Sequence, residues 1–411
     1  MSEHCRFCNT ELQHVFVDLG MSPIANDYVP VERANSMEPF YPLCVYICHE
    51  CLLVQLPAVQ AADEIFRDDY AYFSSVSKSW LDHARRYVEA MIGRFGFDKS
   101  SHVVELASND GYLLQYFREH EVPVLGIEPC ANVAKAAEEK GVPSITEFFG
   151  LEFAETLRAE RNPADLIIGN NVLAHVPDLN DFVSGMKALL APRGIITMEF
   201  PHLLRMMQHN QFDTIYHEHF SYFSFIAVQR VFAEHGLTLF DVEELPTHGG
   251  SLRIYARHAE DDSRPVGGAV DALLETEHAA GFDKLESYLD FEARVHRTKR
   301  ELLKFLIQAR EEGKRIVGYG APAKGNTLLN FCGVRTDFLD YTVDRAPSKQ
   351  NTLLPGIRIP VYTPEKIMET RPDYVLILPW NIAEEISTQM AGIREWGGRF
   401  VVPIPEVRVL D

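Results

Sequence analysis

The sequence predicts an α/β protein in which a small cysteine-bound domain precedes two open, mostly parallel sheets. Three observations support this prediction. Two Cys-x-x-Cys pairs lie within the first 51 residues, and two later segments alternate short apolar runs with helical stretches. In each later segment a tight turn of small residues follows the first apolar run. A chain of 411 residues accommodates three domains. We place them at 1–65, 66–265 and 266–411.

Composition excludes several classes of protein. Hydrophobic residues make up 46% of the chain and charged residues 24%, which is typical of a globular protein rather than a disordered one. No apolar run approaches the roughly 18 residues that a membrane span requires, and the polar N-terminus does not resemble a secretory signal. We therefore expect a cytoplasmic protein without a membrane anchor. A net charge of −20 argues against nucleic acid as a partner. No feature indicates a protein partner.

The front cysteines have the spacing of a zinc site. Cys5-x-x-Cys8 and Cys48-x-x-Cys51 are two knuckles separated by 39 residues. A two-residue spacer lets both thiolates of a pair face one ion, and two pairs complete a tetrahedral zinc site. Four protein ligands leave no open position, so the predicted zinc is structural. The alternatives are unrelated buried thiols or a redox dithiol, although no helix-opening pattern follows either pair.

The first sheet unit carries a turn that favours S-adenosylmethionine. The pattern predicts a strand at 102–106, a turn at 107–111, a helix at 112–120 and a second strand at 124–128. The turn reads Glu105-x-Ala107-x-Asn109-x-Gly111, a variant of the acid-x-Gly-x-Gly-x-Gly loop of methyltransferases. It lacks the Gly-x-Gly-x-x-Gly that cradles the pyrophosphate of a dinucleotide. The turn therefore favours S-adenosylmethionine over NAD.

Two more residues complete the predicted cofactor site. Glu128 ends the second strand, 23 residues after Glu105, where a carboxylate can accept hydrogen bonds from both ribose hydroxyls of an adenosine. Further strands are predicted at 165–169 and 194–199. Asn170 directly follows the first of them, and we assign it to the cofactor site as well.

A second unit of the same kind follows a long charged helical stretch at about 270–313. A strand at 315–320 runs into a turn, and residues 321–327 open a helix. Gly320-x-x-x-x-Gly325 is close to a phosphate loop, but Asn326 stands where the lysine belongs and Lys324 comes two positions early. This departure argues against nucleoside triphosphate hydrolysis. The backbone N–H groups and Lys324 could hold a diphosphate, or the glycines could serve only strand–helix packing.

Later strands of this unit are predicted at 340–344, 374–379 and 400–403. Trp380 follows the second of these strands, at the end of a parallel strand where ligands of open sheets bind. Its ring could stack on a base, or it could be a packed aromatic side chain.

Between the units lies the dense segment, residues 212–222, which contains Tyr216, Glu218 and His219. A His-x-His pair with a glutamate could indicate a metal site, but the His-Glu-x-x-His spacing of metalloproteases is absent. General acid–base chemistry fits better, because histidine titrates near neutrality and an adjacent carboxylate can tune it. His175 follows the strand at 165–169, so we expect it at the same edge. Each histidine alone could equally be structural.

These motifs together resemble a known family. The cysteine box, Glu105 to Gly111, Tyr216-x-Glu218-His219, the segment 248–253 and the segment 318–326 occur in that order across essentially the whole chain. The combination is similar to the nucleotide-sugar C-methyltransferases. It resembles in particular the carbon-3 methyltransferases of dTDP-4-keto-deoxysugars that are destined for antibiotic sugars such as tetronitrose.

The resemblance implies an architecture, cofactors and a site. It implies an N-terminal zinc-binding domain, a middle S-adenosylmethionine domain with a Rossmann-like fold, and a C-terminal Rossmann-like domain that binds a dTDP-linked sugar. It also implies structural zinc and S-adenosyl-L-homocysteine as a product. The implied catalytic residues are Tyr70, His175, Tyr216, Glu218 and His219, with His219 as the base that takes the carbon-3 proton. Lys324 and Asn326 are the substrate-binding residues that it implies, and to these we add Tyr72, Ser75, Gly325 and Trp380.

Two other functions fit parts of the pattern. An NAD-dependent nucleotide-sugar oxidoreductase or epimerase also carries Rossmann-like units and acid–base residues. A zinc-containing protein that binds a nucleotide sugar without catalysis would share the cysteine box and the second unit.

Overall fold

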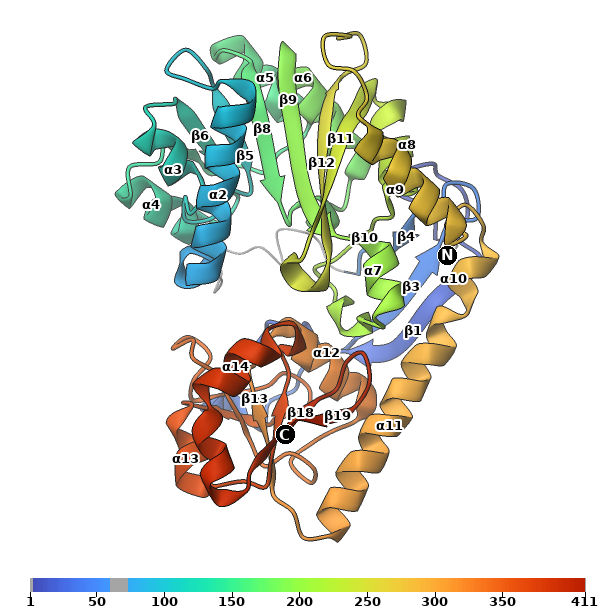
Figure 1. The fold of residues 1–411 in the computed structure, drawn as a ribbon, viewed down its shortest axis with the longest axis vertical. Helices are drawn as coiled ribbons and strands as arrows, with labels where there is room; N and C mark the ends of the chain where they lie inside the picture. Colours follow the sequence, from blue (N-terminus) through green and yellow to red (C-terminus); the bar gives the residue numbers. More distant parts are fainter. Residues whose placement is uncertain (1–2, 60–72, 411) are drawn as a thin grey trace.

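The computed structural model describes residues 3–59 and 73–410, which form three sheets (Figure 1). The N-terminal sheet has four strands in the order β1-β3-β4-β10. Its strands pair antiparallel. They span His14–Ser22 (β1), Tyr41–Ile47 (β3), Val54–Gln55 (β4) and Ser221–Tyr222 (β10). Because β10 belongs to the dense segment, the N-terminal sheet is completed by a strand from the middle of the chain.

The middle sheet has seven strands in the order β11-β12-β9-β8-β5-β6-β7. Its strands span Val103–Leu106 (β5), Val124–Ile127 (β6), Ser144–Ile145 (β7), Ala164–Asn170 (β8), Leu190–Pro201 (β9), Leu237–Leu245 (β11) and Ser251–His258 (β12). Strands β5 to β9 run parallel, and β12 is antiparallel to β9. The order reverses between β5 and β8. Ligands of open α/β sheets bind at such a reversal.

Helices cover both faces of the middle sheet (Figure 1). Alternation along a strand sends Val103 into the core on one face and Val104 into the core on the other. The first face packs against α2 (Lys78–Phe95) and α3 (Leu114–Glu119). The second packs against α5 (Leu151–Glu160), α6 (Leu179–Leu189) and α8 (Phe225–Glu234). The remaining helices of this part are α4 (Ala131–Glu139) and α7 (Leu203–Gln208).

The C-terminal sheet has eight strands in the order β19-β18-β17-β13-β14-β16-β15-β2. Its strands span Val29–Pro30 (β2), Ile316–Tyr319 (β13), Thr342–Val343 (β14), Thr352–Leu353 (β15), Pro360–Tyr362 (β16), Tyr374–Ile377 (β17), Arg399–Val402 (β18) and Arg408–Leu410 (β19). The five strands β13, β14, β16, β17 and β18 run parallel, and their order reverses between β13 and β17. Its helices are α12 (Ala323–Cys332), α13 (Glu365–Thr370) and α14 (Ala383–Gln389). The predicted α/β fold with two Rossmann-like units is confirmed.

The predicted helical stretch at 270–313 is three helices rather than one. They span Gly268–Ala279 (α9), Glu286–Leu289 (α10) and Phe291–Glu311 (α11). The break falls at Gly281, whose φ of +77° is left-handed and ends α9. Helix α11 then runs alongside the N-terminal sheet to the C-terminal domain (Figure 1), and Phe291 stacks on Phe16 with ring centroids 4.7 Å apart.

Strand exchange ties the three predicted domains together. The strand β2 comes from the front of the chain and joins the last sheet, whereas β10 joins the first. The boundaries at 65 and 265 stay predictions. Within residues 3–59 and 73–410, no helix combines the length and the apolar character that crossing a membrane requires.

Candidate active site

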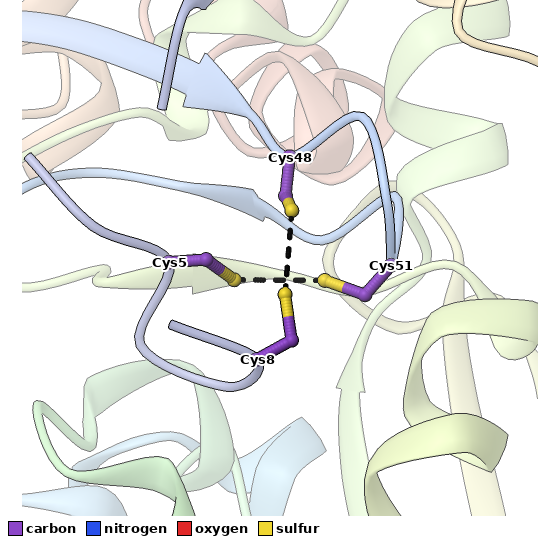
Figure 2. A group of neighbouring side chains, drawn as sticks. All are labelled: Cys5, Cys8, Cys48 and Cys51. Carbon is purple, nitrogen blue, oxygen red and sulfur yellow. Dashed lines mark hydrogen bonds between the residues drawn. The ribbon is translucent and has the colours of Figure 1, made fainter. Parts of the chain in front are cut away.

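The four predicted cysteines form one cluster (Figure 2). Their sulfur atoms all lie within 4.8 Å of one another, and the Cys5–Cys51 and Cys8–Cys48 sulfur pairs are each 3.5 Å apart. A tetrahedral zinc with bonds of about 2.3 Å fits inside such a set of sulfur atoms. Gln55 donates a hydrogen bond from Nε2 to Cys5 Sγ at 3.1 Å, as outer partners of metal ligands commonly do.

The two knuckles have the same local geometry, which is why the spacing could be recognised from sequence. Asn9 and Leu52, each directly after the second cysteine of its pair, have φ of +60° and +63°. The N–H of Asn9 bonds the carbonyl of Cys5 at 2.9 Å, and the N–H of Leu52 bonds that of Cys48 at 2.9 Å. Each turn thus points both of its thiols to one side.

The predicted cofactor turn lies at the strand-order reversal of the middle sheet. Ala107, Asn109 and Gly111 have φ of +52°, +51° and +72°. Left-handed φ is the conformation that glycine adopts most easily, which explains why this loop type usually carries three glycines. Here alanine and asparagine take the same backbone path. The sequence variant therefore keeps the loop geometry.

Glu105 is the penultimate residue of β5, beside this turn, and is 1% exposed. Burial raises the pKa of its carboxyl well above the ordinary value, and a hydrogen bond with Tyr112 opposes that rise. Glu105 Oε2 is buried without a protein hydrogen-bond partner within the described residues. Buried acceptors are normally satisfied, so this oxygen fits a donor from a bound cofactor.

Glu128 and Asn170 flank the turn as predicted. Glu128 accepts hydrogen bonds from the backbone N–H of Asn109 and of Cys130, both at 2.9 Å. Burial raises the pKa of Glu128, and these bonds oppose that effect. The carboxylate therefore clamps the turn, and each oxygen keeps a second lone pair for a ribose hydroxyl. Asn170 Nδ2 lies 3.3 Å from Tyr112 Oη at the end of β8.

Three predicted catalytic rings meet in one cluster, in which His219 is buried and Tyr216 and His175 are half-buried. The centroid of the His219 ring lies 4.0 Å from that of Tyr216 and 4.6 Å from that of His175. His219 Nδ1 lies 2.8 Å from the Thr214 carbonyl, which accepts only a proton-bearing nitrogen. The second nitrogen, Nε2, is therefore the one with a free lone pair in the neutral ring. Burial, and then the neighbouring His175, lower the pKa of His219 well below its usual value, so the ring is neutral.

Glu218 and His217 point to other parts of the molecule. Glu218 Oε1 accepts a hydrogen bond of 2.6 Å from Asn26 Nδ2 of the N-terminal domain. Burial raises the pKa of Glu218 to about 7, and the bond from Asn26 lowers it. His217 Nε2 lies 3.2 Å from the Pro42 carbonyl, away from His219. The His-x-His pair thus does not converge, and the cysteine cluster is the one metal-type group within the described residues.

Lys324 and Trp380 meet next to the dense segment. Lys324 Nζ lies 4.7 Å from the Trp380 ring centroid and 3.4 Å from Asn381 Oδ1. Trp380 donates a hydrogen bond from Nε1 to Asp213 Oδ2 at 2.7 Å. Burial raises the pKa of Asp213 to about 7, and Lys324 opposes that rise. Asp213 was not among the predicted site residues, although it lies inside the dense segment.

The other predicted substrate residues have different surroundings. Gly325 is buried, and Asn326, 1% exposed, bonds the Ala25 carbonyl through Nδ2 at 2.5 Å. Ser75 donates a hydrogen bond to Asp110 of the cofactor turn. Tyr70 and Tyr72 lie outside the described residues. The catalytic role of Tyr70 and substrate contact by the other four residues stay predictions, as does substrate contact by Lys324 and Trp380.

Two further residues with left-handed φ lie at the same edge of the middle sheet, and neither was among the predicted site residues. Asn171 (φ +55°) and His248 (φ +54°) come from different loops, and Asn171 Nδ2 lies 3.2 Å from His248 Nε2. Burial and the nearby Lys324 lower the pKa of His248 to about 4. Such backbone conformations in non-glycine residues occur preferentially at functional sites. The histidine that opens His248-Gly249-Gly250 was the available signal.

Comparison with family models covers most of the chain. Residues 5–66 match a model described as a zinc binding domain, and residues 80–242 match a methyltransferase domain. Residues 246–405 match a C-methyltransferase C-terminal domain.

One curated relative spans the whole chain. The chain is 36% identical over 409 residues to C-methyltransferase NovU of Streptomyces niveus, covering 100% of this chain and 97% of the relative. Solved structures match about half of it. A methyltransferase from Anabaena variabilis is 13% identical with a TM-score of 0.39, covering 49% of this chain and 96% of its own. Magnesium protoporphyrin IX methyltransferase from Synechocystis, with bound SAM, is 13% identical with a TM-score of 0.34, covering 47% and 88%.

Proposed function

The chain belongs to the C-methyltransferases, and from that premise we propose that it methylates carbon 3 of a dTDP-4-keto-deoxysugar with His219 as the base. As a member of this family it is an S-adenosylmethionine-dependent methyltransferase with a structural zinc site. Family membership sets aside the two alternatives from the sequence, an NAD-dependent oxidoreductase and a non-catalytic binding protein.

Removal of a proton from carbon 3 requires a neutral base in a fixed orientation. The Thr214 carbonyl, 2.8 Å from His219 Nδ1, keeps the proton of the neutral imidazole ring on Nδ1. His219 Nε2 is then available to take a proton from a carbon next to a ketone. Burial keeps the imidazole neutral before the reaction. The packed rings of Tyr216 and His175 limit its rotation.

Proton loss places negative charge on the ketone oxygen, which needs a hydrogen-bond donor. Tyr216 and His175 both pack against His219 and can donate from a hydroxyl and an imidazole N–H. One such donor contributes about 3 kcal/mol to transition-state stabilisation. S-adenosylmethionine, held by Glu105, Glu128 and the turn at 107–111, would supply an electrophilic sulfonium methyl group. The enolate carbon of the sugar would bond to that methyl carbon as its bond to sulfur breaks and S-adenosylhomocysteine leaves.

Glu218 has the acidity of a group that exchanges protons near neutral pH. Its pKa of about 7 results from burial, opposed by the hydrogen bond from Asn26. As a carboxylate it can accept a hydrogen bond from a sugar hydroxyl. We assign it this supporting role in the same reaction.

One observation supports the proposal most. The hydrogen bond to Thr214 fixes Nδ1 of His219 and leaves Nε2 unprotonated, and both candidate donors pack against the ring. The test is His219→Asn with purified substrate, following methyl transfer and solvent exchange at carbon 3. Both rates should fall about 10²- to 10⁴-fold. If both rates stay near wild type, His219 is not the base.

His217→Asn is the matched control, because His217 lies two residues away and contacts the Pro42 carbonyl instead. It should retain most of the activity. The affinity for S-adenosylhomocysteine should be unchanged in both variants, since neither residue lies in the cofactor turn.

A further inference from the structure

The first cysteine knuckle packs against the segment that carries His175. Arg6 lies between the two cysteines of this knuckle. Its Nη1 donates hydrogen bonds to the carbonyl of Pro177 at 3.0 Å and to that of Val176 at 3.5 Å. These two residues directly follow His175, which ends the short turn Leu173–His175. A residue of the N-terminal domain therefore holds the backbone beside a predicted catalytic histidine.

Arg6 also contacts the segment that carries His219. Its guanidinium carbon lies 5.3 Å from the centroid of the Phe220 ring, and its Nη2 donates a hydrogen bond to the Leu56 carbonyl. The N–H of Leu56 bonds the Phe220 carbonyl at 2.9 Å, and the N–H of Phe220 bonds the Ala174 carbonyl at 2.7 Å. Because Phe220 directly follows His219, one arginine contacts the backbone segments of both histidines.

The rings of the two histidines depend on each other's position. Their centroids lie 4.6 Å apart at an interplanar angle of 73°, an edge-to-face contact. The ring of His175 also forms a hydrogen bond with the backbone of Glu218, next to His219. A displacement of either backbone segment would therefore change where the candidate donor His175 lies relative to Nε2 of His219.

The backbone of Arg6 is fixed to the zinc ligands. Its N–H donates a hydrogen bond to Gln55 Oε1 at 2.9 Å, and Gln55 Nε2 donates to Cys5 Sγ at 3.1 Å. Gln55 is 1% exposed, so both bonds are shielded from water. When zinc holds Cys5 and Cys8, both ends of the two-residue spacer that carries Arg6 are fixed. The guanidinium group therefore extends from a rigid base.

We infer that Arg6 is a positioning residue, which uses the zinc-bound knuckle as a fixed base to set the separation of His175 and His219. The inference rests on the proposed function, which gives both histidines their roles, and adds that the zinc-binding domain helps to arrange the reaction centre. An arginine that only attached one domain to another would stabilise the protein without affecting the two rings.

The test is NMR spectroscopy of the zinc-loaded full chain with labelled histidine side chains and S-adenosylhomocysteine bound. The ring signal that is lost in His175→Asn identifies His175. Arg6→Met keeps an unbranched side chain against Phe220 but removes the donors, so this signal should shift by more than its width. The kcat for methyl transfer should fall about 10- to 100-fold with little change in KM, because displacement of a reacting group by about 1 Å can cost 100-fold.

Arg230→Met is the matched control. Arg230 Nη1 donates a hydrogen bond to the Glu50 carbonyl of the second knuckle at 3.3 Å and so links the same two domains at another point. This variant should leave the His175 signal and kcat unchanged. An unmoved His175 signal in Arg6→Met, or equal shifts in the two variants, would overturn the inference. Arg6→Lys keeps the charge but loses the planar fork of donors, and it decides the question in the same way if Arg6→Met fails to bind zinc.

Failure of the proposed function gives a different result. If His175→Asn and His219→Asn both keep wild-type methyl transfer, the catalytic roles of the two histidines fail. The shift of the His175 signal in Arg6→Met would still show that Arg6 positions the ring.

Discussion

The middle and C-terminal domains share a strand topology, but the turn after the first strand has different surroundings in the two domains. In both, the strand order reverses beside the first strand, and an acid at the end of the second strand accepts two backbone N–H groups. Glu128 bonds Asn109 and Cys130, and Asp344 bonds Ala321 and Ala346. The acid thus has a structural role in both domains, whether or not a ligand is also held there.

The difference lies in what surrounds the turn. In the middle domain Glu105 has a buried oxygen without a hydrogen-bond partner among the described residues. In the C-terminal domain Tyr28 and Lys349 both donate hydrogen bonds to the Ala321 carbonyl of the turn. Pairing of the central strands differs as well. Leu378 continues to bond Tyr319 beyond the end of β17, so the two strands do not separate at the reversal. A nucleotide-type topology therefore does not by itself imply a nucleotide crevice.

Among the tests of this difference, Gly320→Ala is expected to have the largest effect on stability. The added Cβ would lie 2.5 Å from Pro379 at a φ of +89°, so overpacking and backbone strain add. We expect a loss of about 3 kcal/mol in the free energy of unfolding, measured by urea denaturation. Gly333→Ala has φ of +72° with no atom within 4 Å, and it should cost only about 1 kcal/mol. Equal losses would show that the crevice is not tightly packed.

The second test compares the two acids directly. Glu128→Gln should weaken binding of S-adenosylmethionine about 10- to 100-fold, because it disturbs the turn and removes a ribose acceptor. Asp344→Asn should lower stability without changing the affinity for thymidine diphosphate by more than about twofold. Both affinities are measured by calorimetry. A comparable loss of nucleotide affinity in Asp344→Asn would mean that both crevices hold ligands.

A smaller effect is expected where the N-terminal domain contacts the Glu218 carboxyl group. Asn26→Leu removes the 2.6 Å hydrogen bond to Glu218, which favours the charged form. The pKa of Glu218, about 7 in the wild type, should therefore rise. If the reaction requires the carboxylate, activity at neutral pH falls and the acid limb of kcat/KM shifts to higher pH.

The control for this variant is Tyr28→Phe, on the same segment. It removes the hydrogen bond to Ala321 but leaves Asn26 and Glu218 in contact. It should lower the melting temperature without moving the pH limb. An unmoved limb in Asn26→Leu would show that Asn26 has only a structural role.

The smallest effect is expected from Ala107→Gly in the cofactor turn. Ala107 has φ of +52°, and glycine adopts this conformation with less strain. Stability should change by at most about 1 kcal/mol, in the stabilising direction if strain outweighs the added entropy of the unfolded chain. Thermal unfolding monitors the change. A clear destabilisation would mean that the Ala107 methyl group makes contacts that matter more than its backbone strain.

Local patterns were sufficient for much of this molecule. The Cys-x-x-Cys spacing, the turn from Glu105 to Gly111 and the dense segment each depend on residues close together in the chain, and each has the predicted place in the fold. The helical stretch at 270–313 was predicted as one element because its polarity continues through Gly281. Helix α9 ends there because of the conformation of a single residue.

Short-range patterns were enough to predict the order of the domains, the cysteine cluster, the turn from Glu105 to Gly111 and the position of His219, because short spacing fixes how neighbouring side chains face one ion or one strand edge. Packing of the sheets and domains brings Tyr28 and Lys349 to the Ala321 carbonyl, Asn26 to Glu218, and Asp213 to Trp380. These contacts join residues that lie far apart in the chain. They depend on how sheets and domains pack, and no local spacing specifies that packing.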